Sequence, residues 1–212
     1  MDELSEFSRE ALENLRQPLE TGEIWIARAS AHIRYPCRFL LIAAANPCKC
    51  GYLYQAERAC NKAPHCGAHY FQRLSGPLLD RFDLCVHVEA TSFTSLQNHE
   101  LGETTGDIAA RVRAARRCQS LRFSAHDGIH SNADAHGKLL TQTCALATET
   151  IGWLHNALDH FQLSPRGYHR MLRVARTIAD LEGSDTIEKP HLSEALSFRP
   201  FPASGETAKQ AG

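Results

Sequence analysis

Hydrophobic positions along the chain change their spacing and predict an α/β region at the start. Apolar residues at helical spacing predict a helix over residues 5–19, with Ser5 as its cap and with Pro18 and Gly22 ending it. Two short strands, 23–27 and 32–35, with a turn near Ser30 predict a hairpin. The unbroken apolar run 38–45 is typical of a strand that is covered on both faces of a parallel sheet. A helix over 70–79 and a strand over 81–88 complete the region.

The rest of the chain is patterned for helices. A basic helix is expected over 107–122, a loop rich in histidine and glycine over 124–137, and three more helices over 146–161, 165–181 and 189–196. Ser164 and Pro165 form a helix start, with a capping hydroxyl followed by proline at the first helical position. We therefore expect an α/β region at 1–92, a linker at 93–106, a helical domain at 107–199 and a disordered tail at 200–212.

Composition and charge limit the class of protein. With 43% hydrophobic and 22% charged residues, the chain has an ordinary globular composition. Its 23 Lys and Arg against 24 Asp and Glu give no overall positive field, so any contact with nucleic acid must be local. The sequence shows no membrane-length apolar run, and its first residues are acidic where a signal peptide would be basic and then apolar. These features predict a cytoplasmic protein without a membrane segment.

Cysteines and histidines offer candidate metal sites. Of eight cysteines, the four that cluster are Cys48, Cys50, Cys60 and Cys66. Four soft ligands in a polar loop can hold a tetrahedral zinc ion, and free thiols are the alternative interpretation. The other cysteines are expected to be packing residues. The histidines of the 124–137 loop have a spacing that matches no standard metal site and are expected to be solvated: His126, His130 and His136.

Five separate strings carry a resemblance to a known family. In chain order they are DELSEF at 2–7, LRQPLE at 15–20, ANPCKCGY at 45–52, RLSGPLLDRFDL at 73–84 and YHRMLRVARTIADLEG at 168–183. Together they resemble the magnesium-chelatase-like AAA+ ATPases, in particular the ComM/YifB group, which is associated with competence and DNA recombination in bacteria. The resemblance implies that residues 1–92 are the C-terminal part of an AAA+ α/β core and that 107–199 form a helical lid domain.

The chain departs from the family pattern at its start. Family members carry a glycine-rich phosphate loop ending in Gly-Lys-Ser/Thr, and these 212 residues contain no such string. The match begins at the Walker B position, so the resemblance implies a fragment that lacks the first half of the nucleotide site. We expect this fragment alone to be inactive, although the parent protein would be an ATP hydrolase.

The resemblance assigns the first residues and Asn46 to ATP and magnesium. Asp2 would orient the magnesium ion and Glu3 would polarise the attacking water. Asn46 directly follows the apolar run, and in open α/β sheets ligands lie outside the carboxyl ends of strands, so it would be the sensor of the terminal phosphate. Without the family, the acidic pair is an exposed terminus and Asn46 is a turn residue before Pro47.

Three arginines receive roles from the family. Arg81 resembles the arginine finger that a subunit offers to its neighbour's nucleotide, and Arg73 is the second candidate. Arg166 resembles the sensor in the lid domain. The alternative for Arg81 is a surface ion pair with Asp80 or Asp83, and the alternative for Arg166 is an ordinary surface arginine. The hairpin corresponds to an insertion that faces the central channel of the ring, where Arg28 could contact nucleic-acid phosphates, or it packs at the surface.

Three functions follow. The first is part of a hexameric AAA+ ATPase that remodels DNA or translocates along it. The second is a magnesium-chelatase motor subunit for magnesium insertion into a porphyrin, and the absence of its acidic, proline-rich linker weakens it. The third is a non-enzymatic, zinc-stapled module for nucleic-acid binding or oligomerisation.

Overall fold

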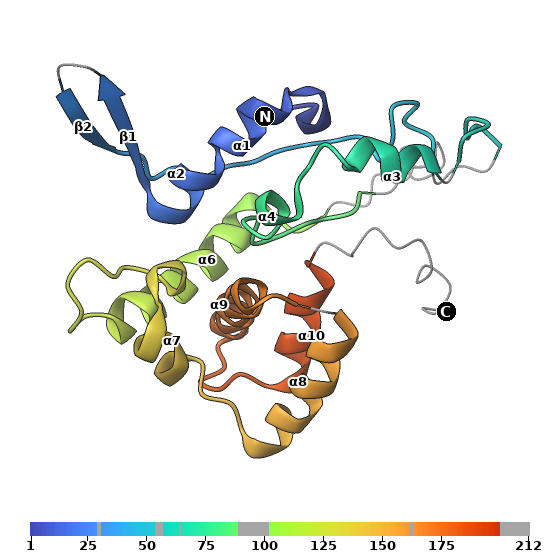
Figure 1. Ribbon diagram of the computed structural model, residues 1–212. Helices are drawn as coiled ribbons and strands as arrows, with labels where there is room; N and C mark the ends of the chain where they lie inside the picture. Colours follow the sequence, from blue (N-terminus) through green and yellow to red (C-terminus); the bar gives the residue numbers. More distant parts are fainter. Residues whose placement is uncertain (29–30, 54–56, 64, 89–101, 162, 200–212) are drawn as a thin grey trace. The chain divides into compact units, whose positions relative to one another are not determined.

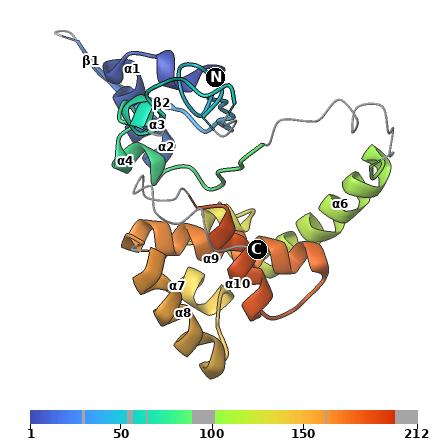
Figure 2. The same ribbon diagram turned by 90° about the vertical axis from the view of Figure 1, so that its right-hand side faces the viewer.

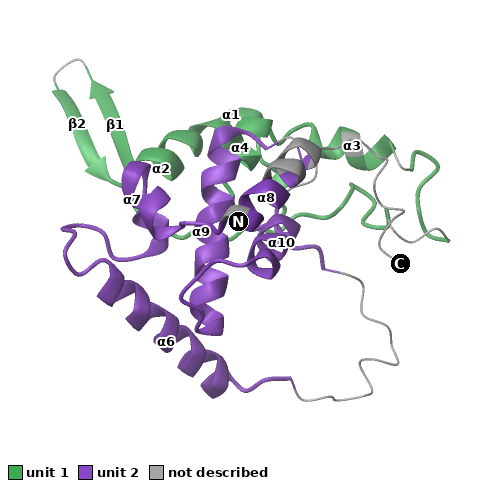
Figure 3. Cartoon of the chain, turned by 90° about the horizontal axis from the view of Figure 1, so that it is seen from below, with its two compact units in different colours: residues 1–82, 201–212 green, residues 83–200 purple. Residues whose placement is uncertain are grey.

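The computed structural model describes residues 1–28, 31–53, 57–63, 65–88, 102–161 and 163–199. These residues fold as two compact units, which are drawn in different colours in Figure 3. Unit 1 is built on Met1–Phe82 and unit 2 on Asp83–Pro200. Much of the predicted linker and all of the predicted tail lie outside the described residues. No described helix is both long enough and apolar enough to cross a membrane.

Unit 1 begins with a short 3-10 helix, η1 (Leu4–Glu6), and two short helices, α1 (Arg9–Asn14) and α2 (Arg16–Thr21). The prediction of one helix over 5–19 was wrong, because the chain breaks at Leu15. The cap is Ser8, whose hydroxyl accepts a hydrogen bond from the Ala11 amide at 3.2 Å. Pro18 does not end a helix but lies in the first turn of α2, where its missing N–H has no intrahelical acceptor to lose.

The predicted hairpin is confirmed. Strands β1 (Glu23–Arg28) and β2 (Ala31–Pro36) pair antiparallel, with Glu23 opposite Pro36 and Arg28 opposite Ala31. Almost every residue of both strands is exposed, including Trp25, which the Arg34 guanidinium overlies at 6.0 Å from the ring centroid. The hairpin therefore leaves both of its faces uncovered within the described residues.

The apolar run 38–45 is extended, but it is not part of a sheet in this structure. Among the described residues the hairpin is the only sheet, so the predicted parallel sheet is not seen there. Leu40 is 84% exposed and Ile42 is 73% exposed, which contradicts the expected cover on both faces. Residues 81–88 likewise form no strand, and Val88 is 83% exposed. An extended segment without a neighbouring strand leaves its ladder donors and acceptors to water.

Helices α3 (His65–Phe71) and α4 (Gly76–Leu79) replace the single helix predicted over 70–79. The Ser75 hydroxyl caps α4 by accepting a hydrogen bond from the Leu78 amide at 3.3 Å. A small core joins these elements to the start of the chain and consists of Leu4, Leu12, Leu74 and Leu78. The core of unit 1 therefore lies between η1, α1 and α4.

Unit 2 is helical, and its long helices match the prediction closely. They are α6 (Thr105–Arg122), α8 (Thr148–Phe161), α9 (Pro165–Glu182) and α10 (Lys189–Ser197). The cap at Ser164 is confirmed, because its hydroxyl accepts from the Gly167 amide at 3.1 Å. The pattern missed a 3-10 helix, η2 (Asn132–Asp134), and the short helix α7 (Gly137–Thr143).

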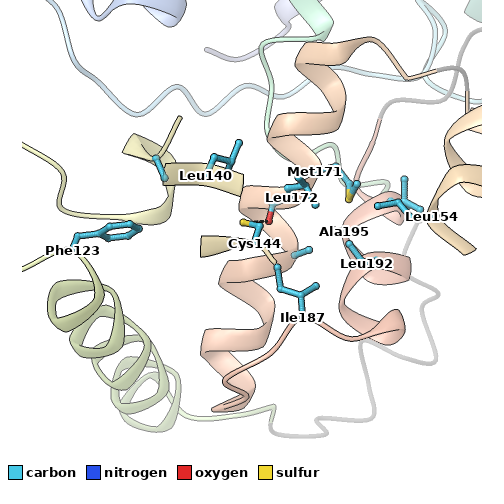
Figure 4. Close-up of a cluster of buried hydrophobic side chains, with 12 residues drawn as sticks. Phe123, Leu140, Cys144, Leu154, Met171, Leu172, Ile187, Leu192 and Ala195 are labelled. Atoms are coloured by element: carbon cyan, nitrogen blue, oxygen red, sulfur yellow. Dashed lines mark hydrogen bonds between the residues drawn. The ribbon is translucent and has the colours of Figure 1, made fainter. Parts of the chain in front are cut away.

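Helix α9 is the centre of unit 2. It packs against α6, α7, α10 and η2, and Figures 1 and 2 show these elements around it. Figure 4 shows the core that results, in which Met171, Leu192 and Ala195 are fully buried. Cys144 lies in this core, so the expectation of a packing cysteine is confirmed there, but it was wrong for Cys118, which is exposed on α6. A parallel bridge between Leu146 and Ile187 ties the segment before α8 to the segment before α10.

A buried ionic network also fastens α9. The Asp180 carboxylate accepts hydrogen bonds from Arg122 at 2.5 and 2.8 Å, from Arg176 at 3.1 Å and from the Asn132 amide at 2.8 Å. Burial by itself would raise the pKa of Asp180, but the bonds from Arg122 and Asn132 outweigh it and hold that pKa below its usual value. The network joins α6, η2 and α9 through one carboxylate.

Candidate nucleotide-binding site

The first residue of the chain pairs with the apolar run. The Met1 amino group donates to the Ile42 carbonyl at 2.6 Å, and the Met1 carbonyl accepts from the Ala44 amide at 2.9 Å. The Leu4 amide then donates to the Ala44 carbonyl at 2.9 Å. Met1 thus bonds to the residues on both sides of Ala43, which is the hydrogen-bond pattern of parallel strands. Two segments that are far apart in sequence run side by side here in the same direction.

The acidic pair directly follows this point of pairing. Asp2 and Glu3 are both exposed, and the Asp2 carboxylate accepts a hydrogen bond from the Glu3 amide at 2.9 Å. Glu3 adopts a left-handed backbone conformation with φ of 49°, and it is the non-glycine residue with positive φ among the described residues. Such strain in a non-glycine residue tends to mark functional positions. Both carboxylates therefore face solvent next to the parallel pairing.

Asn46 leaves the same pairing on the neighbouring segment. It lies three residues after Ala43, is exposed, and is followed by Pro47. Since parallel segments end at the same edge, Asp2, Glu3 and Asn46 all follow the pairing on one side of it. The structure thus brings the predicted acidic pair and the predicted sensor to a common edge of unit 1.

Arg81 is held inside unit 1. Its side chain is only 8% exposed, its Nη2 lies 2.5 Å from a carboxylate oxygen of Glu20, and its Nε donates to the Arg16 carbonyl at 3.0 Å. It also donates to the Pro77 carbonyl. The partner Glu20 could not be found from the sequence, because the two residues share no helix or strand pattern. In this structure Arg81 joins α2 to α4.

Arg73 is the more exposed of the two candidate fingers. Its side chain is 54% exposed, and its guanidinium donates to the Ser5 carbonyl at 3.1 Å and lies 3.6 Å from the Glu6 carboxylate. Arg73 is therefore attached to η1, the element that follows Asp2 and Glu3.

Tyr70 also lies beside Glu6. Burial raises the pKa of Tyr70, and the neighbouring Glu6 carboxylate raises it further.

Arg166 belongs to unit 2, where it is the second residue of α9 and is exposed. The other arginines of this helix are engaged within unit 2. Arg170 pairs with Asp83 at 2.6 Å, Arg173 donates to the Ala135 carbonyl at 2.8 Å, and Arg176 belongs to the Asp180 network. Sequence alone could not choose among these arginines, and these contacts give three of them structural roles.

The clustered cysteines come together beside α3. The Sγ atoms of Cys48, Cys50 and Cys66 all lie within 4.8 Å of one another, and those of Cys48 and Cys50 are 3.0 Å apart. The Cys60 thiol interacts with those of both Cys50 and Cys66, and its Sγ lies outside this group of three. The hydrogen bond from Cys48, helped by backbone amides, lowers the pKa of Cys50 to about 6, whereas burial raises that of Cys66. Among the described residues, Cys48, Cys50 and Cys66 form the one group of three or more side chains that could hold a metal ion.

The three loop histidines do not form such a group. His126 and His130 line a shallow cavity of about 280 Å³ with Phe123 and Asp127, and His136 contacts the Asp134 carbonyl at 2.6 Å. His126, His130 and His136 are all exposed, and no described cysteine or carboxylate completes a metal site with them. Their interpretation as solvated loop residues stays the simpler one.

Two family models match this chain. One, described as magnesium chelatase, subunit ChlI, matches residues 1–96, and the other, described as its C-terminal part, matches residues 102–199. The chain belongs to the magnesium-chelatase-like AAA+ family.

Known relatives narrow the comparison further. The chain is 43% identical over 200 residues to competence protein ComM of Haemophilus influenzae. It is 40% identical over 200 residues to the YifB proteins of Salmonella typhimurium and of Escherichia coli. Each match covers 94% of this chain and 38% of the relative, so the chain spans well under half the length of the curated relatives it matches. The resemblance to the ComM/YifB group is confirmed, and these matches do not favour a chelatase motor or a non-enzymatic module.

Proposed function

We propose that this chain is part of a ring-forming AAA+ ATPase that couples ATP hydrolysis to DNA remodelling or translocation in competence or recombination. The observation that carries the proposal is the parallel pairing of Met1 with the segment around Ala43. It sets a carboxylate pair and a carboxamide at the edge where α/β folds bind their ligands. The relative named a competence protein supports the biological setting.

The side chains at this edge fit ATP with magnesium in their chemistry. Carboxylate oxygens are the ligands that magnesium prefers, and Asp2 and Glu3 offer them at the exposed surface of unit 1. Asp2 and Glu3 would hold the ion, which would supply positive charge against the phosphate oxygens. Asp2 would orient the hydrated ion, Glu3 would accept the proton of the attacking water, and Asn46 would hold that water by its carboxamide.

An arginine would reach this site from a neighbouring subunit. We assign the role to Arg81, with Arg73 as the second candidate. In the isolated subunit a triphosphate would have to compete with Glu20 for the Arg81 guanidinium, whereas Arg73 already projects at the surface. A planar, permanently charged guanidinium in either position stabilises negative charge that develops during phosphoryl transfer.

Unit 2 would act as the lid. Its compact helical fold and the match of residues 102–199 to the C-terminal family model support this role. Arg166, exposed in the first turn of α9, would then sense the nucleotide. A hexameric ring and DNA as the substrate complete the proposal, and the exposed hairpin with Arg28 is the element we assign to DNA contact.

The test compares two versions of the protein. One is this chain, and the other extends it upstream through the genomic reading frame. We expect ATP turnover only from the extended version, because these 212 residues contain no glycine-rich phosphate loop. Glu3→Gln should abolish turnover and retain ATP binding, whereas Glu10→Gln, which alters an exposed carboxylate of α1, should leave turnover unchanged.

Two outcomes would contradict the proposal. Turnover by the short chain that Glu3→Gln abolishes would show that a complete site exists without the phosphate loop. An extended version that binds no ATP would remove the ATPase function. In mixed rings, a subunit lacking its finger should block hydrolysis in its neighbour, so Arg81→Ala and Arg73→Ala tell the two candidates apart.

A further inference from the structure

The stretch from Pro47 to the start of α3 has no hydrophobic core of its own. Its described residues form turns rather than helices or strands, and in the described part before α3 the one buried side chain is that of Cys48, which is 0% exposed. Lys49, Arg58 and Lys62 are exposed. A polar segment of this kind buries too little apolar surface to offset the loss of chain entropy on folding. Some other interaction must hold its turns in place.

The cysteines stand where these turns begin. The Cys48 carbonyl accepts from the Gly51 amide at 3.0 Å, and the Cys60 carbonyl accepts from the Ala63 amide at 2.9 Å. Gly51 has φ of +79°, a conformation that glycine adopts without strain, so the first turn can fold back tightly after Cys50. Cys66 is the second residue of α3. Each turn therefore directs a thiol towards the same point.

Close packing brings the first turn against the helix. A Cβ atom on Gly67 would lie 2.5 Å from the Leu53 side chain and 3.2 Å from the Pro47 carbonyl. Glycine allows this approach without displacing the Leu53 side chain, and in this arrangement the thiols of Cys48 and Cys50 meet that of Cys66. Residues that are 16 or more positions apart thus converge on one small volume.

We propose that Cys48, Cys50, Cys60 and Cys66 together bind one structural zinc ion as four thiolates. Four sulfurs at about 2.3 Å from zinc in a tetrahedron are about 3.8 Å from one another. The Sγ atoms of Cys48 and Cys50 are 3.0 Å apart, and those of Cys48, Cys50 and Cys66 all lie within 4.8 Å of one another, so these three thiols need only small shifts to take up that spacing. We assign the fourth position to Cys60, which interacts with the Cys50 and Cys66 thiols, although its Sγ lies outside this group of three.

Charge favours the same assignment. Four thiolates around one zinc ion leave a centre with two net negative charges, and any thiol that is still protonated releases its proton to solvent on binding. The exposed cations Lys49, Arg58 and Lys62 belong to the same stretch, in which Glu57 is the described acidic residue. With four protein ligands the metal has no open position, so the ion is structural and not catalytic.

The zinc ion would stabilise unit 1 through α3. This helix leads from Cys66 to Tyr70, which is 7% exposed, and then to Leu74 of the small core. Metal removal should therefore loosen residues 47–74 and leave unit 2 folded. This inference does not depend on the proposed ATPase activity.

The test measures metal in the complete 212-residue chain. We expect one zinc ion per chain in native mass spectrometry. Cobalt substitution should give the intense charge-transfer and visible bands of a tetrahedral thiolate site. Cys60→Ser should lose most of this signal, whereas Cys118→Ser, which alters an exposed cysteine of α6, should keep it.

A second measurement covers variants that fail to fold. In the unaltered chain, a chelator should make four further cysteines accessible to thiol alkylation, whereas Cys144, which is buried in the core of unit 2, should stay protected with or without the chelator. Absence of bound metal with no chelator-sensitive protection would overturn the proposal. So would equal loss of metal in Cys118→Ser and Cys60→Ser, or retention of the full cobalt spectrum in Cys60→Ser.

Discussion

Units 1 and 2 handle their apolar residues in opposite ways. Among the residues that the structure describes, unit 2 buries a core of 12 around α9, so most of its helices have a covered face. The described part of unit 1 buries a core of four and leaves Leu40 and Ile42 largely in water. The difference is not one of hydrophobicity, because residues 38–45 form one of the most apolar runs in the chain.

Backbone hydrogen bonding explains the difference. A helix satisfies its own amides and carbonyls, so five or six helices can close a core without help from elsewhere. A strand needs neighbours on both sides, and the run 38–45 finds a partner only near Met1 among the described residues. The helices of unit 2 therefore satisfy their backbone hydrogen bonds within themselves, while the exposed run of unit 1 resembles a strand without a neighbouring strand on either side.

The largest expected effect comes from breaking the ionic network of unit 2. Asp180→Ala would leave Arg122 and Arg176 without their shared carboxylate, and Arg176 is buried. Removing one partner of a buried ion pair costs about 3–5 kcal/mol. We expect urea unfolding followed by hydrogen exchange to show loss of unit 2 with little change in unit 1.

The matched control is Asp127→Ala, which removes an exposed carboxylate from the same unit. Its effect should stay within about 0.5 kcal/mol. Equal destabilisation by both variants would mean that the network does not hold unit 2 together.

Sequence reasoning succeeded for unit 2 and failed for much of unit 1 for the same physical reason. The bounds of α9 follow from local signals, namely Ser164, Pro165 and Gly183, and the structure places them as expected. The strand predicted over 38–45 depends on adjacent strands that would pair with it in a parallel sheet, and the described residues form no such strands. The Asp180 network and the Glu20–Arg81 pair join residues 58 and 61 positions apart, for which a single sequence carries no signal.

The candidate site shows the same division. Sequence placed Asn46 after an extended segment and grouped the four cysteines, because both depend on local order. The convergence of the thiols depends on Gly67 packing against Leu53, which no spacing rule predicts. The roles of Asp2, Glu3, Arg81, Arg73 and Arg166 came from the family resemblance and stay predictions.

Acid should affect unit 2 through the same carboxylate. The pKa of Asp180 is lower in the folded protein than its ordinary value of 3.8, so its ionised form stabilises the fold. That contribution is fully present above the unfolded pKa and is lost as the pH falls through the lower folded pKa. Each unit of difference is worth about 1.4 kcal/mol.

We therefore expect the urea concentration at the unfolding midpoint of unit 2 to decrease when the pH is lowered below about 4, because carboxylates of the unfolded chain then take up protons. The carboxyl ¹³C resonance of Asp180 should titrate below pH 3.8. Glu103→Gln removes an exposed carboxylate that pairs with Arg111, so it should leave most of the acid sensitivity in place. A normal titration of Asp180 would contradict the prediction.

The smallest effect is expected in the exposed run of unit 1, and it sharpens the comparison most. Leu40 is 84% exposed, so Leu40→Ser removes little buried surface and should change the stability of this chain by less than about 0.5 kcal/mol. If neighbouring strands complete the sheet in a longer version of the protein, the same side chain becomes buried. There the substitution should cost about 2–5 kcal/mol, as for other core leucines. Thermal unfolding of both versions gives the two values.

Leu121→Ser, which alters an exposed leucine of α6, is the control and should be neutral in both versions. A large loss in the short chain would show that the run is already packed, whereas neutrality in both would show that no sheet forms over it.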